Sequence, residues 1–295
     1  MKKLFKLLAA TLLCTFMWSM TVCAETTDKP VIALGADLSA DQRATVLSLM
    51  GVTEQDLANY TVITITNEDE HKYLDSYVDP AVIGTRALSS VMVTPAEAGH
   101  GVMVTTQNIN YCTTGMYRNA LLTAGVEDAD IMVVGPTEIS GTAGLIGAVK
   151  AYEQVSGEPI SDETLDTAMN ELVTTGELVT KSASDEEVEA LIAYIKAKLA
   201  AGELETEDDI RNAIKEGEQK FDVSLDESEE QQIVDFMLKI KKLGLDPNVL
   251  LDQAADLYSK FGDELLNKAT DDGFFSGLGN IVNSIADFFK GLFKK

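Results

Sequence analysis

The sequence predicts an α+β or α/β protein: an N-terminal mixed-sheet domain with flanking helices, then an all-helical domain and a C-terminal amphipathic helix. Three observations predict it. Short β-branched runs alternate with helical runs over residues 31–134, strand signals nearly vanish after Gly157, and apolar residues recur at helical spacing from Gly273 onward. The predicted divisions are a leader (1–24), an α/β domain (25–157), a helical domain (158–272) and a terminal helix (273–295).

The leader has the features of a cleavable secretory signal peptide. Three lysines precede an uncharged apolar run from Leu7 to Met20, and Val22-Cys23-Ala24 offers a cleavage site before Glu25. The run is shorter than the ~20 apolar residues that span a bilayer, which argues against the alternative of an uncleaved anchor. We therefore expect a secreted protein, or one on the extracellular face of the cell envelope, after cleavage near Ala24.

Without the leader the chain is strongly acidic and has one cysteine. Three of the 23 basic residues lie in the leader, so 20 remain against 48 acidic residues, a net charge of −28. This negative field argues against a nucleic-acid partner. The lone Cys112 forms no internal disulfide, and we predict a buried structural thiol at a strand-to-helix junction, with a nucleophile as the alternative.

The strands are predicted where β-branched residues cluster or alternate: Val31–Leu34, Tyr60–Thr66, Leu88–Thr94, Gly101–Gln107 and Ile131–Val134. The third and fourth are expected to pair as a hairpin, because Pro95–His100 between them contains a proline and a glycine. The last is expected to end at Gly135-Pro136.

The helices of the first half are predicted from apolar spacing followed by glycine stops: from Ser39 or Ala40 to Met50, from Glu68 toward Tyr77, Thr113–Ala124 and Gly141–Val155. The second half contains about five helices. Ser184–Glu187 and Thr206–Asp209 have capping-box spacing, and Asp246-Pro247 starts a further helix. The acidic residues there are expected to form solvated faces; the alternative, a calcium site, lacks a D-x-[DN]-x-[DN]-G loop.

Recognised catalytic and cofactor motifs are missing, so we expect no cofactor and no metal. His71 is expected to be solvated on a polar helix and His100 to lie in a turn. The segment Gly135–Gly144 is the more informative one, because it runs from a strand end into a helix start, where free backbone N–H groups bind anions or polar groups. We predict ligand binding there by Glu138, Ser140, Gly141 and Thr142; the alternative is an ordinary helix start capped by Ser140.

Several motifs resemble the YpuA-like family of exported bacterial proteins, which is catalogued as domain of unknown function 1002. They are Thr113–Val126, Asp128–Asp130, Val134–Pro136 and Ile139–Gly144, and Val31–Ser39 adds to them. The resemblance covers nearly all of the chain after the leader. It implies a secreted or envelope protein of Gram-positive type bacteria, and it supplies no activity or catalytic residues.

The terminal helix has a continuous apolar stripe that ends in lysines, as in helices that lie at a membrane interface. Residues predicted to contact a membrane or a protein partner are Phe274, Phe275, Leu278, Ile281, Ile285, Phe288, Phe289, Leu292, Phe293, Lys290 and Lys294. The alternatives are docking on the helical domain and pairing with a second copy. Asn280, Asn283 and Asp287 interrupt the stripe, so it is not a transmembrane span.

Two classes of function are consistent with the sequence. The first is a binding module whose α/β domain takes a ligand and whose terminal helix contacts a membrane or partner. The second is an exported hydrolase or transferase that uses Glu138, Ser140 and Thr142, with the glutamate as acid or base. The missing catalytic motifs favour the first.

Overall fold

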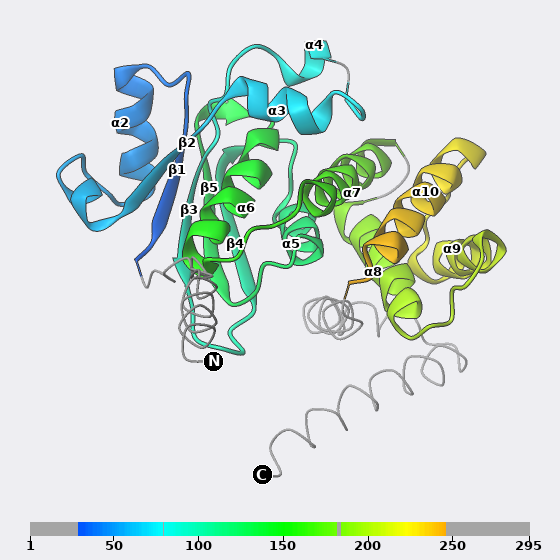
Figure 1. The fold of residues 1–295 in the computed structure, drawn as a ribbon. Helices are drawn as coiled ribbons and strands as arrows, with labels where there is room; N and C mark the ends of the chain where they lie inside the picture. The colour runs from blue at the N-terminus through cyan, green and yellow to red at the C-terminus, as the bar shows by residue number, and fades with distance from the viewer. Residues whose placement is uncertain (1–28, 79, 182–183, 246–295) are drawn as a thin grey trace, which may run out of the picture.

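The protein has a five-stranded mixed sheet flanked by helices, and further helices continue the chain (Figure 1). The computed structural model describes residues 29–78, 80–181 and 184–245. The strands lie in the order β2-β1-β3-β5-β4, and β3 alone among them runs antiparallel to its neighbours. Their bounds are β1 (Val31–Gly35), β2 (Thr61–Ile65), β3 (Ser90–Pro95), β4 (Val102–Ile109) and β5 (Ala129–Ile139). The predicted α+β class is confirmed.

The predicted hairpin between Leu88–Thr94 and Gly101–Gln107 is wrong, because β5 lies between β3 and β4. Val133 of β5 pairs with Val91 of β3 on one side and with Thr106 of β4 on the other. The burial of the strands explains this order. Six residues of β5 are buried, which is typical of a central strand with a neighbour on each side. Strand β4 exposes every second side chain at its start, which suits the outermost strand of a sheet.

The sequence predicted that β5 ends at Gly135-Pro136, but the strand continues to Ile139. The register between β4 and β5 shifts between Gln107 and Ile109, which accommodates the Gly-Pro pair. Asn108 in this shift has a φ of 58° and donates its side-chain N–H to the Gly135 carbonyl at 3.0 Å. Proline cannot donate to a ladder, and the irregularity lets the strand pass without that bond.

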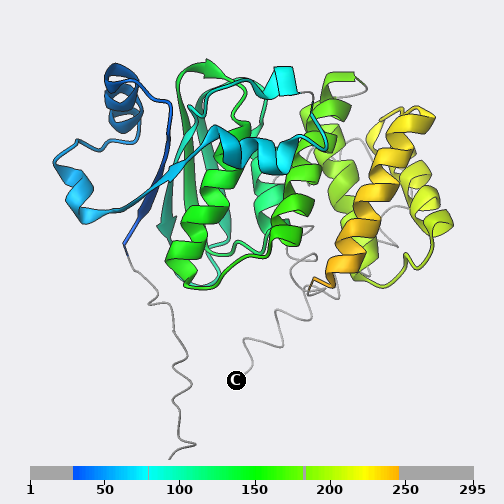
Figure 2. The same cartoon turned by 45° about the horizontal axis from the view of Figure 1, so that its top comes forward.

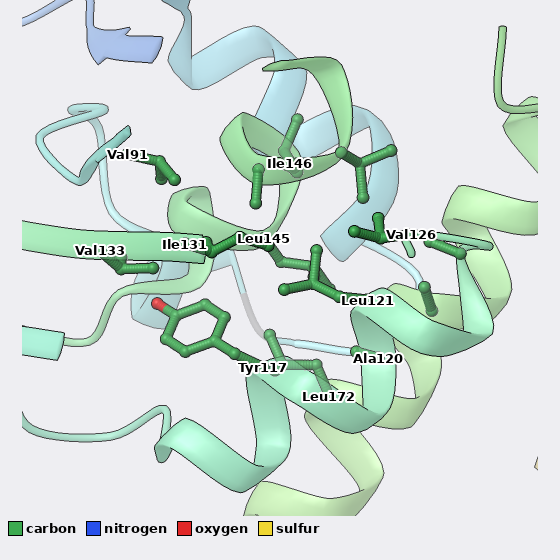
Figure 3. Packing of buried hydrophobic residues seen from close by; sticks show 14 of the residues in the cluster. Val91, Tyr117, Ala120, Leu121, Val126, Ile131, Val133, Leu145, Ile146 and Leu172 are labelled. Atoms are coloured by element: carbon green, nitrogen blue, oxygen red, sulfur yellow. The ribbon is translucent and has the colours of Figure 1, made fainter. Parts of the chain in front are cut away.

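Helices cover both faces of the sheet, with different helices on each (Figure 2). Ala33 of β1 belongs to the same core as Leu145 of α6, whereas its neighbour Ile32 packs with Leu47 of α2 on the other face. Figure 3 shows the first of these cores, where Tyr117 lies beside side chains of the sheet. The helices of this part are α2 (Ala40–Leu49), η1 (Asp56–Asn59), α3 (Asn67–Leu74), α4 (Pro80–Ile83), α5 (Thr114–Thr123) and α6 (Thr142–Ser156).

The described chain after α6 is helical: α7 (Asp162–Lys181), α8 (Asp185–Ala200), α9 (Glu207–Phe221) and α10 (Glu227–Leu243). Helix α7 contributes to two cores. Its residues from Leu165 to Val173 join the core between the sheet and its helices, where α7 packs on α5, and its Leu178 belongs to the core formed with α8, α9 and α10. The capping boxes predicted at Ser184 and Thr206 are present and begin α8 and α9. The domain boundary after Gly157 stays a prediction.

Three predicted features lie outside the described residues: the leader 1–24, the helix starting at Asp246-Pro247 and the terminal helix 273–295. Within the part of the chain that the structure describes, no helix is both long enough and apolar enough to cross a membrane.

Candidate functional site at the carboxyl edge of the sheet

The carboxyl ends of β1, β2, β4 and β5 meet at one edge of the sheet, because only β3 runs the other way. After β1 the chain passes to α2 on one face, and after β2 and β5 it passes to α3 and α6 on the other. Open α/β sheets bind ligands outside the strand ends where connections diverge in this way. The polar side chains gathered at this edge form what we call the carboxyl-edge cluster: Asp37, Asn67, Glu70, Ser90 and Thr142.

Glu70 is the most buried acid of the cluster, with 3% of its surface exposed. Its carboxylate accepts hydrogen bonds from Nδ2 of Asn67 at 3.2 Å and from Oγ1 of Thr142 at 3.4 Å. Burial raises the pKa of Glu70, and the negative charge of Asp37 adds to this, while the two hydrogen bonds and His71 oppose it. Glu70 therefore holds a proton at a higher pH than an ordinary glutamate.

Asp37 is held against the start of β3. Its N–H donates to the Ala87 carbonyl at 3.2 Å, and its carboxylate accepts the Ala87 N–H at 2.8 Å. Oγ of Ser90 accepts the N–H of Gly35 at 3.2 Å. A Cβ at Gly35 would lie 2.4 Å from the Ala87 carbonyl oxygen, so glycine permits this close approach. The loop after β1 is thus fixed, and it presents the exposed Asp37 toward solvent.

The start of α6 differs from the expected serine cap. Its N-cap residue is Gly141, with φ of 94° and no side-chain hydrogen bond, so the alternative in which Ser140 caps the helix is wrong. The hydroxyl of Tyr117 donates to the Gly141 carbonyl at 2.5 Å. A Cβ at Gly141 would lie 2.4 Å from that hydroxyl. The left-handed backbone and the tyrosine together require glycine here, which a sequence cannot reveal without the packing of α5.

Of the four residues predicted to bind a ligand, Thr142 lies in the carboxyl-edge cluster. Glu138 is exposed near the end of β5. Ser140 is half-buried, and its carbonyl accepts the N–H of Cys112 at 3.1 Å. The structure therefore places Glu70, and not Glu138, as the carboxylate beside Thr142.

Asn67 and Glu70 were missed in the sequence because they belong to the first turns of a polar helix, where acids are common. One local pattern does mark them. Thr66 and Asp69 form a capping box directly after β2, which brings the following side chains to the carboxyl edge. Which of those acids becomes buried depends on α6, and that contact is 72 residues distant in sequence.

A second buried polar group joins α5, α7 and α8. Nζ of Lys196 donates to Oε1 of Glu171 at 2.8 Å and to Oγ1 of Thr123 at 2.7 Å. The threonine hydroxyl in turn donates to Oε2 of Glu171 at 2.5 Å. Burial lowers the pKa of Lys196, and the charge of Glu171 opposes this. All three side chains are buried, so the group ties helices together and does not face a ligand.

Glu189 of α8 lies at the beginning of α5. Its carboxylate accepts the hydroxyl of Thr113, the N-cap of α5, at 2.5 Å. A Cβ at Gly115 would lie 1.7 Å from Oε2 of Glu189, so glycine makes room for the acid. A negative charge at a helix start is favourable, and here it links α8 to the first half of the chain.

The other candidate groups of the sequence have structural partners. Cys112 is buried as predicted, and burial raises its pKa to about 12, which disfavours the thiolate that a nucleophile needs. Nδ1 of His71 lies 2.6 Å from Oδ1 of Asp75, and Nε2 of His100 lies 3.0 Å from Oδ1 of Asp130. Among the residues with described positions, no three His, Cys, Asp or Glu side chains gather as a metal site would require.

Comparison with known proteins places these features in a family. The chain belongs to the family described as protein of unknown function (DUF1002), whose pattern matches residues 34–257 and so includes the carboxyl-edge cluster. It is similar to the uncharacterized protein YpuA of Bacillus subtilis (strain 168), with 38% identity over 295 residues, 97% of this chain and 99% of that protein. No solved structure matches significantly. The resemblance stated from the sequence motifs is confirmed.

Proposed function

We propose that the protein is an exported binding module without enzymatic activity. Its carboxyl-edge cluster holds a small polar ligand, and residues 273–295 attach it to a membrane or to a protein partner. One observation carries the ligand proposal: a buried glutamate, Glu70, shares weak hydrogen bonds with side chains from two different connections at the ligand-binding edge of an α/β sheet.

The chemistry of the cluster supports a ligand that donates hydrogen bonds. Asp37 and Glu70 offer carboxylate oxygens, and Thr142 offers a hydroxyl oxygen, whereas the buried Ser90 is occupied by the Gly35 N–H. The bonds at Glu70 are 3.2 Å and 3.4 Å long, toward the weak end of the range, so a better donor can compete with them. Hydroxyl and ammonium groups are such donors, and hydroxylated amines carry both.

Binding is favoured over hydrolysis by the position of the candidate catalytic groups. The hydrolase alternative needs Glu138 to be poised by burial or by a neighbouring charge beside Ser140, and Glu138 is exposed. The raised pKa of Glu70 suits proton transfer as well as binding, but its 3.4 Å contact with the Thr142 hydroxyl is longer than the ~2.6–3.2 Å that joins a nucleophile to its base.

Export and attachment rest on the sequence. The lysines and apolar run of residues 1–24 support export. The stripe of residues 273–295 and its lysines support attachment, because an amphipathic helix of this composition lies in a membrane interface. The two ideas agree, since a surface-attached receptor on the outside of a cell needs both.

Calorimetric titration of the protein without residues 1–24 tests the ligand proposal. The probes are glucosamine, which carries hydroxyl and ammonium groups, and glucose as its uncharged counterpart. We expect saturable heat with glucosamine and its loss in Glu70→Gln, while the exposed Glu138→Gln keeps it. Unfolding temperatures of both variants show whether either has lost its fold. No saturable heat with either probe, or equal loss in both variants, contradicts the proposal.

A further inference from the structure

A groove lies where α8 and α10 end, away from the carboxyl-edge cluster. It is open on one side and has a volume of about 460 Å³, within the usual ~300–1,000 Å³ of binding pockets. Five apolar side chains line it, together with two glycines and the charged Glu205 and Lys241; the apolar ones are Leu199, Ala200, Leu204, Ile240 and Leu245. The groove borders the core formed by α8, α9 and α10. In this core Leu204 and Ile240 are buried, and Leu199 and Leu245 pack at its margin.

Two left-handed glycines shape the groove. Gly202 follows α8 with φ of 74°, and Gly244 ends α10 with φ of 63°, its N–H donating to the Lys241 carbonyl. Nζ of Lys241 then donates to the carbonyls of Leu204 and Glu205, at 3.2 Å and 2.6 Å, and ties the two helix ends together. The groove is thus a built feature of the fold with a fixed frame.

The described chain ends at the rim of this groove. Leu245 is both a lining residue and the last described residue, and 50 residues follow it in the sequence, from 246 to 295. The family match continues to residue 257, which is 12 residues beyond Leu245. The family pattern therefore includes residues that follow directly after the groove.

The sequence after Leu245 has an apolar face of the right kind. Pro247 suits the first position of a helix, and apolar residues then recur at helical spacing: Leu250, Ala254, Leu257, Tyr258 and Phe261. The opposite positions are polar, among them Asp252, Asp256 and Ser259, so that face stays in solvent when the apolar face docks. From residue 250 to residue 261 a helix rises roughly 16 Å, enough to cover a groove of this volume.

We propose that the groove is the docking site of the chain's own continuation, the apolar face of residues 247–261. Docking covers the half-buried Leu199 and Leu245 with apolar side chains and extends the core formed by α8, α9 and α10. It also fixes the point from which the terminal segment leaves the protein, whatever that segment later contacts. The inference is independent of the ligand and attachment proposals.

Disulfide trapping in the protein without residues 1–24 tests the proposal, because Cys112 is then the sole native cysteine and is buried. Ala200→Cys is combined in turn with Leu250→Cys, Ala254→Cys and Leu257→Cys. Matched controls place the second cysteine on the polar face, at Asp252 or Ser259. We expect at least one apolar-face pair to close within one molecule under mild oxidation, and neither control to do so.

Truncation gives the second measurement. A version ending at Leu245 is expected to unfold at a lower temperature than one ending at Asp272, and Leu257→Ser in the latter is expected to reproduce part of that loss. Disulfides between molecules would overturn the proposal in favour of a second copy. Equal trapping by both faces, or equal unfolding temperatures of the two versions, would overturn it as well.

Discussion

Nζ of Lys196 lies 2.8 Å from Oε1 of Glu171, and the two side chains are only 1% and 0% exposed. The pair joins α8 to α7, and Thr123 brings α5 into the same contact. A buried ion pair adds little net stability compared with apolar residues in the same place. Replacing only one of its partners, however, leaves the other charge buried and uncompensated. The link between the sheet and the last helices therefore depends on both partners being present.

Lys196→Met is expected to lower the free energy of unfolding by about 3–5 kcal/mol, because it strands the carboxylate of Glu171. Lys196→Met combined with Glu171→Leu is expected to recover most of that loss. Urea unfolding followed by circular dichroism measures both. A double variant as unstable as the single one would show that the pair itself, and not the stranded charge, supplies the stability.

Glu70 should make stability depend on pH in a recognisable direction. Its pKa in the folded protein is raised above the ordinary value of 4.5, so the folded state binds its proton more tightly than the unfolded state does. The stability from this group is complete below pH 4.5 and is lost as the pH rises through the raised pKa.

Glu70→Gln keeps the neutral form at every pH and is the matching control. The variant is expected to gain stability relative to the wild type as the pH rises from 4 toward neutrality, even though other carboxylates change the stability of both proteins alike. Unfolding free energies at several pH values test this. A constant difference across that range would contradict the burial of an ionising Glu70.

Gly115→Ala is expected to destabilise the protein by about 1–3 kcal/mol, the usual cost of overpacking. The added methyl would meet Oε2 of Glu189 at 1.7 Å and push the carboxylate away from Thr113. In a Glu189→Ala background the same change should cost much less. A double-mutant cycle from urea unfolding measures the coupling, and additive effects would exclude the clash as the cause.

The terminal segment is expected to bind anionic vesicles weakly. The apolar stripe of residues 273–295 contributes a part of the binding free energy that salt does not remove. Each lysine near the membrane surface adds about 1 kcal/mol to it. Phe288→Ser with Phe289→Ser should abolish most co-sedimentation without changing the unfolding temperature, and added salt should weaken it only in part. Equal pelleting of the full chain and of a version ending at Asp272 would rule out attachment by this segment.

Local patterns predicted most helices of the described chain, because capping residues and glycine stops act within a few residues. Ser184 and Thr206 begin helices as expected, and Gly125 and Gly157 follow the ends of α5 and α6. Strand pairing failed where it is non-local. The turn residues before Val102 indicate a reversal of direction, which does occur, but they contain no information on which strand will lie beside which.

The candidate site was predicted by location rather than by residue. The segment around Thr142 was chosen because helix starts after strands bind ligands, and Thr142 does contact the buried acid. The acid itself comes from another connection, and burial selected Glu70 from several acids of one turn. Likewise nothing in the sequence distinguishes Glu171 and Lys196 from surface charges, because they become buried only when three helices pack together.

The position of β5 between β3 and β4 sets an order on folding. Chains are synthesised from the N-terminus, so β3 and β4 exist before β5 does. Only six residues, 96–101, separate them, and short loops close fastest. We expect a transient hairpin of β3 with β4 to compete with the native sheet until residues 129–139 emerge. In that case β5 has to enter between two strands that have already paired, and the sheet closes late in folding.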